Sequence, residues 1–242
     1  MKKNKNNSWI EKLHNEEIKI LDEFDRICKK NNLNYFFSGG TLIGAVRHKG
    51  FIPWDDDIDI GMPRTDYEKF IKCCKKDLNK DFYLDVFETN KKSFRLYAKL
   101  KLKNTMFVEN YIKNLENIDH GIWIDIFPYD NIEEINSKNH LKKDNFRHLI
   151  TKLVNLKSGM RNYLSEYRKT HRITMFFVDI FLKLCPRRVL LFIEKKKLSS
   201  NKNNNSKYLS NMTGGLSLEK ETHLRSDIFP LIKLEFEGKK YY

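Results

Sequence analysis

Four carboxylates within five residues constrain this chain more than any other feature. They are Asp55, Asp56, Asp57 and Asp59, and no basic residue separates them. Residues 57–60 alternate polar and apolar as a half-buried strand does, and residues two apart on a strand share a face. Asp57 and Asp59 should therefore point the same way, about 7 Å apart. Their oxygens suit a hard cation such as Mg²⁺, which binds one or two carboxylates together with phosphate oxygens. A solvated acidic turn is the alternative.

A calcium loop is the other site that this spacing suggests. Asp55, Asp57, Asp59 and Asp66 match the first, third, fifth and last ligand positions of an EF-hand loop. That loop needs glycine at its sixth position for a sharp turn, and this chain has Ile60 there. We therefore reject the calcium loop.

A glycine turn precedes the acids. An aromatic run over 34–37 predicts a short strand, and a helix is predicted over 41–47. Gly39 and Gly40 between them permit close approach of a ligand to the backbone, and the N–H groups of a helix N-terminus attract anions. Thr41 adds a hydroxyl. The turn is not a Walker loop, because no Gly-Lys-Ser/Thr follows it.

A third acidic element lies further along the chain. Asp125 is the single acid in an otherwise apolar strand predicted over 121–128. A buried carboxylate is costly unless it is paired or bound to a metal. Asp125 is therefore a candidate third carboxylate of the site, and an outward-facing position on an edge strand is the alternative.

These three elements together are typical of the nucleotidyltransferase fold, and their sequence resembles a known family. The segment Phe37–Phe70 resembles the LicD family of phosphocholine transferases, which includes the fukutin-related proteins. The similarity is dense over 33–70 and returns at Trp123–Pro128. The resemblance implies an α+β fold: a mixed nucleotidyltransferase-type sheet with flanking helices and a helical C-terminal half.

The resemblance also implies an activity. Members transfer phosphocholine, or a similar substituted phosphate, from a CDP-linked donor to a hydroxyl of a cell-surface glycan such as lipopolysaccharide, teichoic acid or capsule, with Mg²⁺ or Mn²⁺. Carried over to this chain, Asp57 and Asp59 are metal ligands. Asp125 is a third ligand or the base that takes the acceptor proton. The expected partners are the CDP-linked donor and a glycan or glycolipid acceptor.

The remaining expected site residues bind substrate. The resemblance implies that the glycine turn at Gly39, Gly40 and Thr41 holds donor phosphate oxygens. Three basic residues lie between that turn and the acids, and we expect one or two of them to clamp phosphate. These residues are Arg47, His48 and Lys49.

The chain divides by charge and character near residue 135. Residues 1–130 hold 23 Lys and Arg against 21 Asp and Glu, whereas 131–242 hold 23 against 11, within a total of +14. We expect a catalytic core over 1–135 and a helical basic region over 136–242, with helices over 137–157, 161–184 and 187–198 and a loop over 199–206. We expect the C-terminus to be truncated relative to the family.

The cysteines and the apolar segments of the sequence indicate where in the cell the protein is expected. The four cysteines show no paired metal spacing, and the adjacent pair Cys73 and Cys74 would make a strained disulfide, which favours a reducing compartment. No uncharged stretch reaches 18 residues, which predicts no spanning helix. We expect a cytoplasmic protein. Residues 173–193 contain an apolar run that extends from Met175 to Leu184 and is followed by Arg187 and Arg188. Peripheral contact with the inner face of the cell membrane is one hypothesis for them, and a pair of core helices is the other.

Two further functions compete with the proposed transfer. A nucleotidyltransferase acting on RNA would use the basic half as a track and would bind with strong salt dependence. Residues 42–54 fit that function poorly, so we do not expect a nucleic-acid partner. A catalytically inactive relative acting as a binding subunit is the second alternative.

Overall fold

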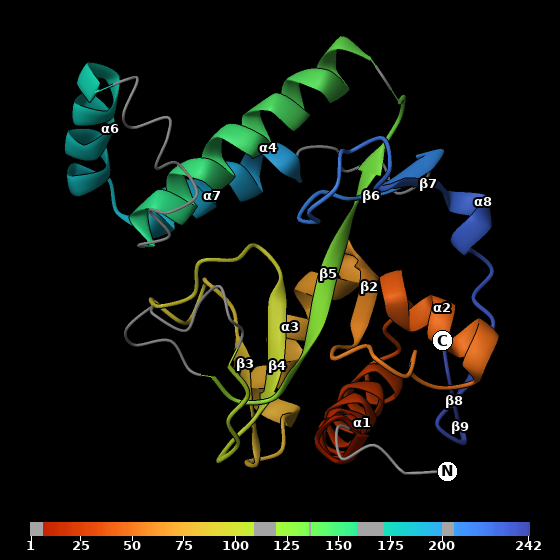
Figure 1. The fold of residues 1–242 in the computed structure, drawn as a ribbon. Helices are drawn as coiled ribbons and strands as arrows, with labels where there is room; N and C mark the ends of the chain where they lie inside the picture. Colours follow the sequence, from red (N-terminus) through yellow and green to blue (C-terminus); the bar gives the residue numbers. More distant parts are fainter. Residues whose placement is uncertain (1–6, 109–119, 136, 159–171, 200–205) are drawn as a thin grey trace.

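The computed structural model of the chain describes residues 7–108, 120–135, 137–158, 172–199 and 206–242, and Figure 1 shows its elements. The helices are α1 Asn7–Lys30, α2 Gly39–His48, α3 Arg64–Asp77, α4 Lys138–Lys157, α6 Arg172–Leu184, α7 Arg187–Leu198 and α8 Arg225–Ile228. The strands are β1 Phe36–Phe37, β2 Asp59–Pro63, β3 Phe82–Asp85, β4 Ala98–Leu102, β5 Trp123–Ile132, β6 Tyr208–Asn211, β7 Thr222–Leu224, β8 Leu234–Phe236 and β9 Lys239–Tyr241.

A mixed seven-stranded sheet is the frame of the protein. Its strands run in the order β1-β2-β5-β4-β3, and β6 and β7 extend it from the second half of β5. Among the described strands of this sheet, β2 and β5 pair in parallel and the other pairs are antiparallel. The ten-residue strand β5 is the longest, and it joins the two parts of the sheet. This arrangement confirms the predicted α+β fold class.

The two faces of the sheet have different characters. Alternate residues of β2 and β5, among them Ile60, Met62 and Ile124, are fully buried in the main core with α1 and α3. Because side chains alternate across a strand, Asp59 and Asp125 project from the opposite face. The period-two pattern thus separates an apolar packing face from the face that carries Asp59 and Asp125.

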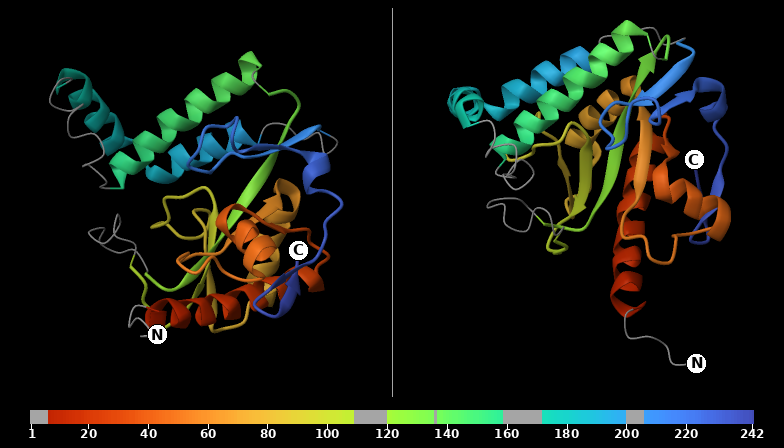
Figure 2. Two further views of the ribbon diagram at one scale, coloured as in Figure 1. Left: turned by 45° about the vertical axis from the view of Figure 1, so that its right-hand side comes forward. Right: turned by 45° about the horizontal axis from the view of Figure 1, so that its top comes forward.

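A second apolar core holds the helices of the C-terminal half. Buried residues of α4, α6 and α7 pack there with Phe87 and Phe94 from the segment between β3 and β4. Figures 1 and 2 show α4 and α7 side by side across one end of the sheet, with α6 at their outer end. The predicted helices at 137–157 and 187–198 match α4 and α7. Of the helix predicted over 161–184, the part over 161–171 lies outside the described residues, as does most of the loop predicted over 199–206.

The structure also contains strands β6 to β9, which were not predicted. The hairpin of β8 and β9 turns at Glu237 and Gly238, both with positive φ (47° and 74°). Such two-residue turns favour Asn or Asp followed by Gly, so a Glu at the first position weakens the sequence signal. Here Glu237 is held by tertiary contact, because its Oε1 accepts a hydrogen bond from the backbone N–H of Phe51.

The C-terminal hairpin belongs to the main core. Phe236 is fully buried, and its ring lies 5.0 Å from that of Phe37 and 4.9 Å from that of Phe51 between ring centroids. The N–H of Phe37 donates to the carbonyl of Tyr242, so the last residue supports β1. The C-terminus accordingly lies beside α2 (Figure 1).

Within the described part of the chain, no helix combines the length and apolarity needed to cross a bilayer.

Replacing Phe236 tests the structural role of the hairpin. Phe236→Ala should lower the free energy of unfolding by roughly 3–5 kcal/mol, because it leaves a cavity between two aromatic rings. Urea denaturation measures the change. Ile232→Ala is the matched control, since that side chain is 68% exposed and should matter by less than about 0.5 kcal/mol. Equal midpoints for the two variants would show that the hairpin does not support the core.

Candidate active site

Three carboxylates from two separate parts of the sequence converge on the face of the sheet opposite the main core. Asp59 is the first residue of β2, Asp57 precedes it in the loop, and Asp125 is the parallel register partner of Asp59 on β5. One oxygen from each lies within 4.8 Å of the others. The structure therefore brings together the three acids that the sequence selected, and we call them the carboxylate cluster.

Asp57 reaches the cluster from a loop and not from a strand. The predicted strand over 57–60 begins only at Asp59, because pairing with β5 starts there. The carbonyl of Ile58 accepts a hydrogen bond from the N–H of Asp125, at 2.8 Å, which ties the end of the loop to β5. Loop geometry, and not the strand alternation, thus determines where the Asp57 carboxylate lies.

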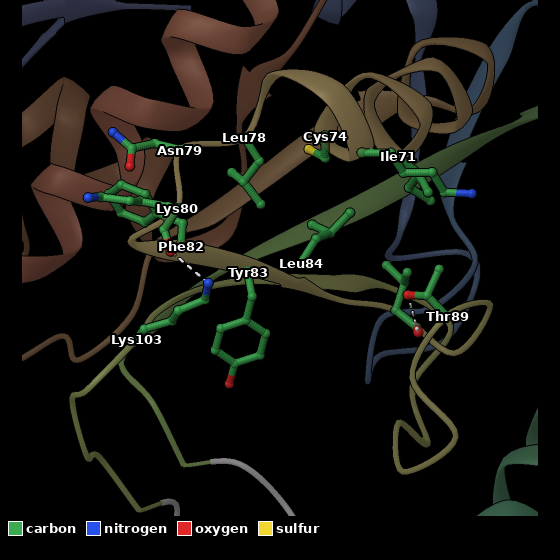
Figure 3. Close-up of a pocket in the computed structure, with 12 residues that line it drawn as sticks. Ile71, Cys74, Leu78, Asn79, Lys80, Phe82, Tyr83, Leu84, Thr89 and Lys103 are labelled. Carbon is green, nitrogen blue, oxygen red and sulfur yellow. Dashed lines mark hydrogen bonds between the residues drawn. The ribbon is translucent and has the colours of Figure 1, made fainter.

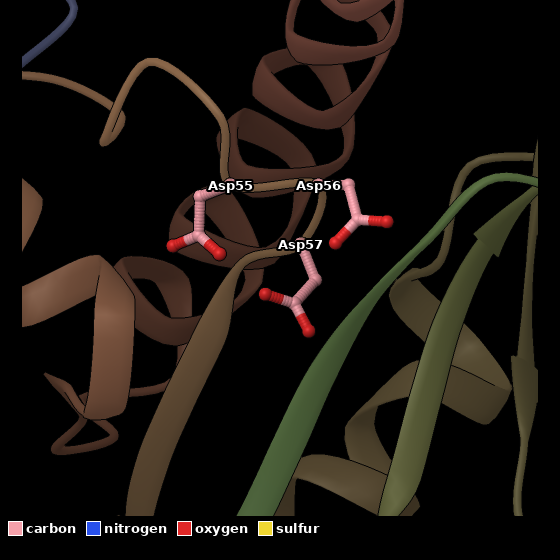
Figure 4. Close-up of side chains that lie close together, drawn as sticks. All are labelled: Asp55, Asp56 and Asp57. Atoms are coloured by element: carbon pink, nitrogen blue, oxygen red, sulfur yellow. The ribbon is translucent and has the colours of Figure 1, made fainter.

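A second group of acids adjoins the cluster. Asp55, Asp56 and Asp57 each offer one oxygen within 4.8 Å of the others. Figure 4 shows all three side chains extending to the same side of the loop before β2. Asp56 is exposed, whereas Asp55 and Asp57 are half-buried. The negative charge is therefore concentrated beside the cluster.

The glycine turn makes room for these acids. A Cβ on Gly39 would lie 2.6 Å from Oδ2 of Asp59, and a Cβ on Gly40 would lie 2.4 Å from Oδ2 of Asp55. Gly39 also has a φ of +54°, in the region that favours glycine. Both glycines are thus required where α2 begins, because carboxylates occupy the space that any side chain would take.

Thr41 positions one member of the cluster. Its hydroxyl oxygen accepts a hydrogen bond of 2.8 Å from the backbone N–H of Asp59, and the residue is buried. The hydroxyl proton is a donor that this bond leaves available. Thr41 therefore fixes the start of β2 at the N-terminus of α2.

A buried lysine balances part of the negative charge. Nζ of Lys99 lies 3.1 Å from Oδ1 of Asp125, and Lys99 is the register partner of both Asp125 and Asp85. Its ammonium also lies 3.8 Å from the ring centroid of Trp123, within cation–π range. A row of charged residues, Asp59, Asp125, Lys99 and Asp85, thus crosses four adjacent strands.

Burial and mutual repulsion raise the pKa values of the cluster. The pKa of Asp57 is raised to about 7, first by burial and then by the charge of Asp125. The pKa of Asp59 is raised to about 8, first by burial and then by the charge of Asp57. Both shifts mean that the protein alone does not compensate three ionised carboxylates at this place.

Glu17 is a member of the site that the sequence analysis missed. It comes from α1, is 1% exposed, and none of the described groups forms a hydrogen bond with its Oε2. Its pKa is raised to about 10, first by burial and then by the charge of Asp57. The sequence did contain a signal for it. Glu17 lies between Leu13 and Ile20 on the apolar stripe of α1, where burying a carboxylate costs free energy.

Helix α1 also supports the acidic loop through a histidine. Nε2 of His14 is within hydrogen-bonding distance of the carbonyl of Asp55, at 2.8 Å. The imidazole stacks on Phe51 with ring centroids 3.7 Å apart and planes inclined by 2°. His14 and Glu17 lie one turn apart, so this part of α1 packs next to the acids.

The three basic candidates do not join the cluster. Arg47 and His48 lie in the last turn of α2, and Lys49 follows it, whereas the glycine turn is at the first turn. All three are exposed, and Lys49 pairs with Glu235 of the C-terminal hairpin at 3.3 Å. These residues are close to the acids in sequence, but they are not close to the cluster in space, because the chain turns back after α2.

Two cavities lie away from the cluster. One of about 300 Å³ is lined by α3, β3 and flanking residues including Lys80 and Lys103 (Figure 3). Another of about 400 Å³ lies between the end of β5 and the start of α4, lined in part by Asn131 and His140. Neither is lined by a carboxylate of the cluster.

The donor atoms of the site fit a hard divalent cation. Asp57, Asp59 and Asp125 provide only oxygen ligands, which Mg²⁺ and Mn²⁺ prefer. A divalent charge would offset the repulsion that raises the pKa values of Asp57 and Asp59. Asp57, Asp59 and Asp125 are thus one of the groups of acids, among the described residues, that could hold a metal ion.

Comparison with known proteins identifies related sequences. A model of the family described as LicD/FKTN/FKRP, nucleotidyltransferase domain, matches residues 32–157, which include the carboxylate cluster. The lipopolysaccharide cholinephosphotransferase LicD of Haemophilus influenzae is 44% identical over 71 residues, covering 29% of this chain and 27% of that protein. The human ribitol 5-phosphate transferase FKRP is 42% identical over 36 residues, covering 15% of this chain and 7% of that protein.

A further relative has no described activity. An uncharacterised protein of Rickettsia prowazekii is 31% identical over 105 residues, covering 35% of this chain and 38% of its own length. The chain therefore spans less than half the length of each of these three relatives.

The raised pKa values predict how stability depends on pH. Without metal, the contribution of Asp57 and Asp59 to stability should be most favourable near pH 4 and become less favourable towards pH 8, because their folded-state pKa values, about 7 and about 8, exceed the ordinary 3.8. Thermal melts in a chelator should show that the melting temperature of Asp59→Asn depends less on pH than that of the unmodified protein. At pH 8 it should be several degrees higher than that of the unmodified protein. Asp81→Asn, at an exposed acid remote from the cluster, should follow the unmodified protein. A wild-type-like curve for Asp59→Asn would contradict the raised pKa.

Glu17 allows a second test. Its pKa of about 10 means that it is neutral at neutral pH, so Glu17→Gln should change the free energy of unfolding of the metal-free protein by less than about 1 kcal/mol. Urea denaturation measures this. A large stabilisation would show instead that Glu17 is ionised and adds to the repulsion, whereas Glu17→Ala should destabilise through the cavity that it leaves.

Proposed function

The chain belongs to the LicD/FKTN/FKRP family of nucleotidyltransferase domains, and from this membership we propose that it is a metal-dependent phosphotransferase. The reaction is transfer of a substituted phosphate, phosphocholine or a close analogue, from a CDP-linked donor to a hydroxyl of a cell-surface glycan. The observation that carries the proposal is the convergence of Asp57, Asp59 and Asp125 within 4.8 Å.

The names of the relatives support the substrate class. One is a cholinephosphotransferase and another is a ribitol 5-phosphate transferase. Both names describe the movement of a phosphate that carries an alcohol, although the two alcohols differ in charge and size. The shared chemistry is therefore at the phosphate, and the donor headgroup is the variable part. Lipopolysaccharide, teichoic acid and capsule are the proposed classes of acceptor.

The residues of the cluster have distinct proposed roles. Phosphoryl transfer depends on positioning and on neutralising charge more than on covalent chemistry by the protein. Asp57, Asp59 and Asp125 would hold Mg²⁺ or Mn²⁺, which when bound acts as a Lewis acid on phosphate oxygens. Asp59 is positioned by Thr41, and Asp125 by Lys99, before any substrate binds.

Asp125 fits the role of ligand better than that of base. The ammonium of Lys99 lies against both of its oxygens, at 3.1 Å and 3.2 Å, and stabilises the anionic form. The same ammonium faces the site from the sheet, where it would also attract a phosphate anion.

Glu17 is neutral at neutral pH, so it adds no further negative charge that the metal and Lys99 must balance.

The glycine turn retains a role in donor binding under this proposal. Gly39 and Gly40 open α2, and N–H groups at a helix N-terminus favour anions. Thr41 can donate its hydroxyl proton to a phosphate oxygen. Arg47, His48 and Lys49 lie at the other end of α2, so they would reach only a distal part of a substrate.

The cellular site of this activity is also proposed. We place the protein in the cytoplasm with peripheral contact at the inner face of the cell membrane, where lipid-linked glycan acceptors would be accessible. The basic C-terminal half, with 23 Lys and Arg against 11 Asp and Glu over 131–242, supports attraction to an anionic surface.

Release of CMP tests the proposal. The protein is incubated with Mn²⁺, a glycolipid acceptor extract and, in turn, CDP-choline, CDP-ethanolamine, CDP-glycerol and CDP-ribitol. One donor should give CMP together with labelled acceptor. Asp59→Asn should reduce the rate by roughly a thousandfold, equivalent to about 4 kcal/mol of lost transition-state stabilisation, while Asp81→Asn should remain fully active.

Other outcomes would favour the competing functions. Salt-sensitive RNA binding with nucleotide incorporation would favour an RNA-directed nucleotidyltransferase. No CMP from any of the four donors, from a folded protein, would favour a non-catalytic binding subunit. Full activity of Asp59→Asn would contradict the assignment of the metal ligands.

A further inference from the structure

Helix α6 carries an exposed apolar stripe that no described residue covers. Six large side chains recur at the spacing of one helix face. They are between 40% and 79% exposed: Ile173, Phe176, Phe177, Ile180, Phe181 and Leu184. Soluble proteins rarely expose this many aligned apolar groups without a binding role.

The other face of α6 is packed. Met175 and Leu182 are buried in the second core, and Val178 packs partly against it. The helix is therefore attached to the protein along one side and presents the stripe along the other. Figures 1 and 2 show α6 at the outer end of α4 and α7, away from the sheet.

The neighbouring helix continues the apolar surface. α7 begins after a two-residue connection, Cys185 and Pro186. On α7, Val189, Phe192 and Ile193 follow helix spacing and are between 44% and 55% exposed. The layer formed by α4, α6 and α7, which we call the helical layer, therefore has two exposed apolar stripes.

The helical layer is strongly basic. α4, α6 and α7 together contain thirteen Lys and Arg against three Asp and Glu. Of the acids, Asp144 pairs with Arg147 at 2.9 Å and Glu194 is buried. Lys183 on α6 and Lys196 and Lys197 on α7 are exposed.

The combination of apolar stripe and positive charge selects the partner. Two copies of this surface would bring like charges together, which disfavours self-association through it. An anionic bilayer complements both features: basic residues attract its headgroups, and aromatic and aliphatic side chains enter the headgroup region. α6 has 13 residues, about 20 Å at 1.5 Å per residue, which suits lying in the interface and not crossing a hydrocarbon core of about 30 Å.

We propose that α6 is an interfacial helix that docks the protein on bilayers containing anionic phospholipid. Ile173, Phe177 and Phe181 would insert into the headgroup region, and the exposed lysines Lys183, Lys196 and Lys197 would contact lipid phosphates. This inference identifies the surface behind the peripheral membrane contact proposed above. Membrane binding by α6 needs neither the donor nor the carboxylate cluster, so it is tested separately from the transfer activity.

Vesicle flotation tests the proposal with the full chain. The protein should float with vesicles of equal parts phosphatidylglycerol and phosphatidylcholine, and binding should weaken as salt is added. Affinity for pure phosphatidylcholine should be at least about tenfold lower. Phe177→Asp/Phe181→Asp should reduce binding to the anionic vesicles by about a hundredfold, because two large apolar groups are lost from the interface.

Two controls separate docking from other effects. Ile232→Asp changes a 68% exposed apolar residue outside the helical layer and should bind vesicles as the unmodified protein does. Circular dichroism should show the double variant folded, and its CMP release with a water-soluble acceptor should be unchanged. Unchanged vesicle binding by the double variant would overturn the proposal. Absence of vesicle binding by the unmodified protein would also overturn it. This holds even if sedimentation shows that the protein self-associates and that the double variant does not, because the surface would then bind a second copy of the chain.

Discussion

The repulsion among carboxylates gathered at one end of two parallel strands is the constraint around which this protein is organised. Asp57, Asp59 and Asp125 have oxygens within 4.8 Å of one another, in surroundings that raise the pKa of Asp57 to about 7 and that of Asp59 to about 8. A fold selected for stability alone would separate these groups or replace them. The proposed divalent cation would supply the positive charge that offsets this repulsion, and neighbouring residues of the fold position the acids without it.

Four local features hold the acids. Thr41 ties the backbone of Asp59 to the start of α2, and the ammonium of Lys99 pairs with Asp125. Gly39 and Gly40 leave space for carboxylates that any side chain would displace. Glu17 closes the site from α1, and burial raises its pKa to about 10 so that it adds no charge at neutral pH. These features come from different elements of the first half of the chain, so the site depends on the fold and not on one motif.

The features that the sequence predicted are those encoded within a few neighbouring residues. The acidic run, the glycine turn and the lone Asp125 were recognisable because each is a local departure from its surroundings, and the strand pairing of Asp59 with Asp125 then joined them. Glu17 escaped because its role depends on how α1 packs, some forty residues before the acids. Arg47, His48 and Lys49 were expected near the acids by sequence distance, but α2 places them at its far end. The hairpin of β8 and β9 was missed because tertiary contacts hold Glu237 in its turn.

The apolar stripe of α6 and the carboxylate cluster lie in separate parts of the protein and carry separate proposals, membrane docking and phosphate transfer. The account depends on the second. Isothermal titration of Mn²⁺ into the metal-free protein at neutral pH tests it most directly, in buffers of different ionisation enthalpy. We predict one or more binding events accompanied by proton release, since metal binding displaces protons from carboxylates of raised pKa, and loss of that signal in Asp59→Asn. Absence of Mn²⁺ binding, or binding that Asp59→Asn leaves unchanged, would contradict the account.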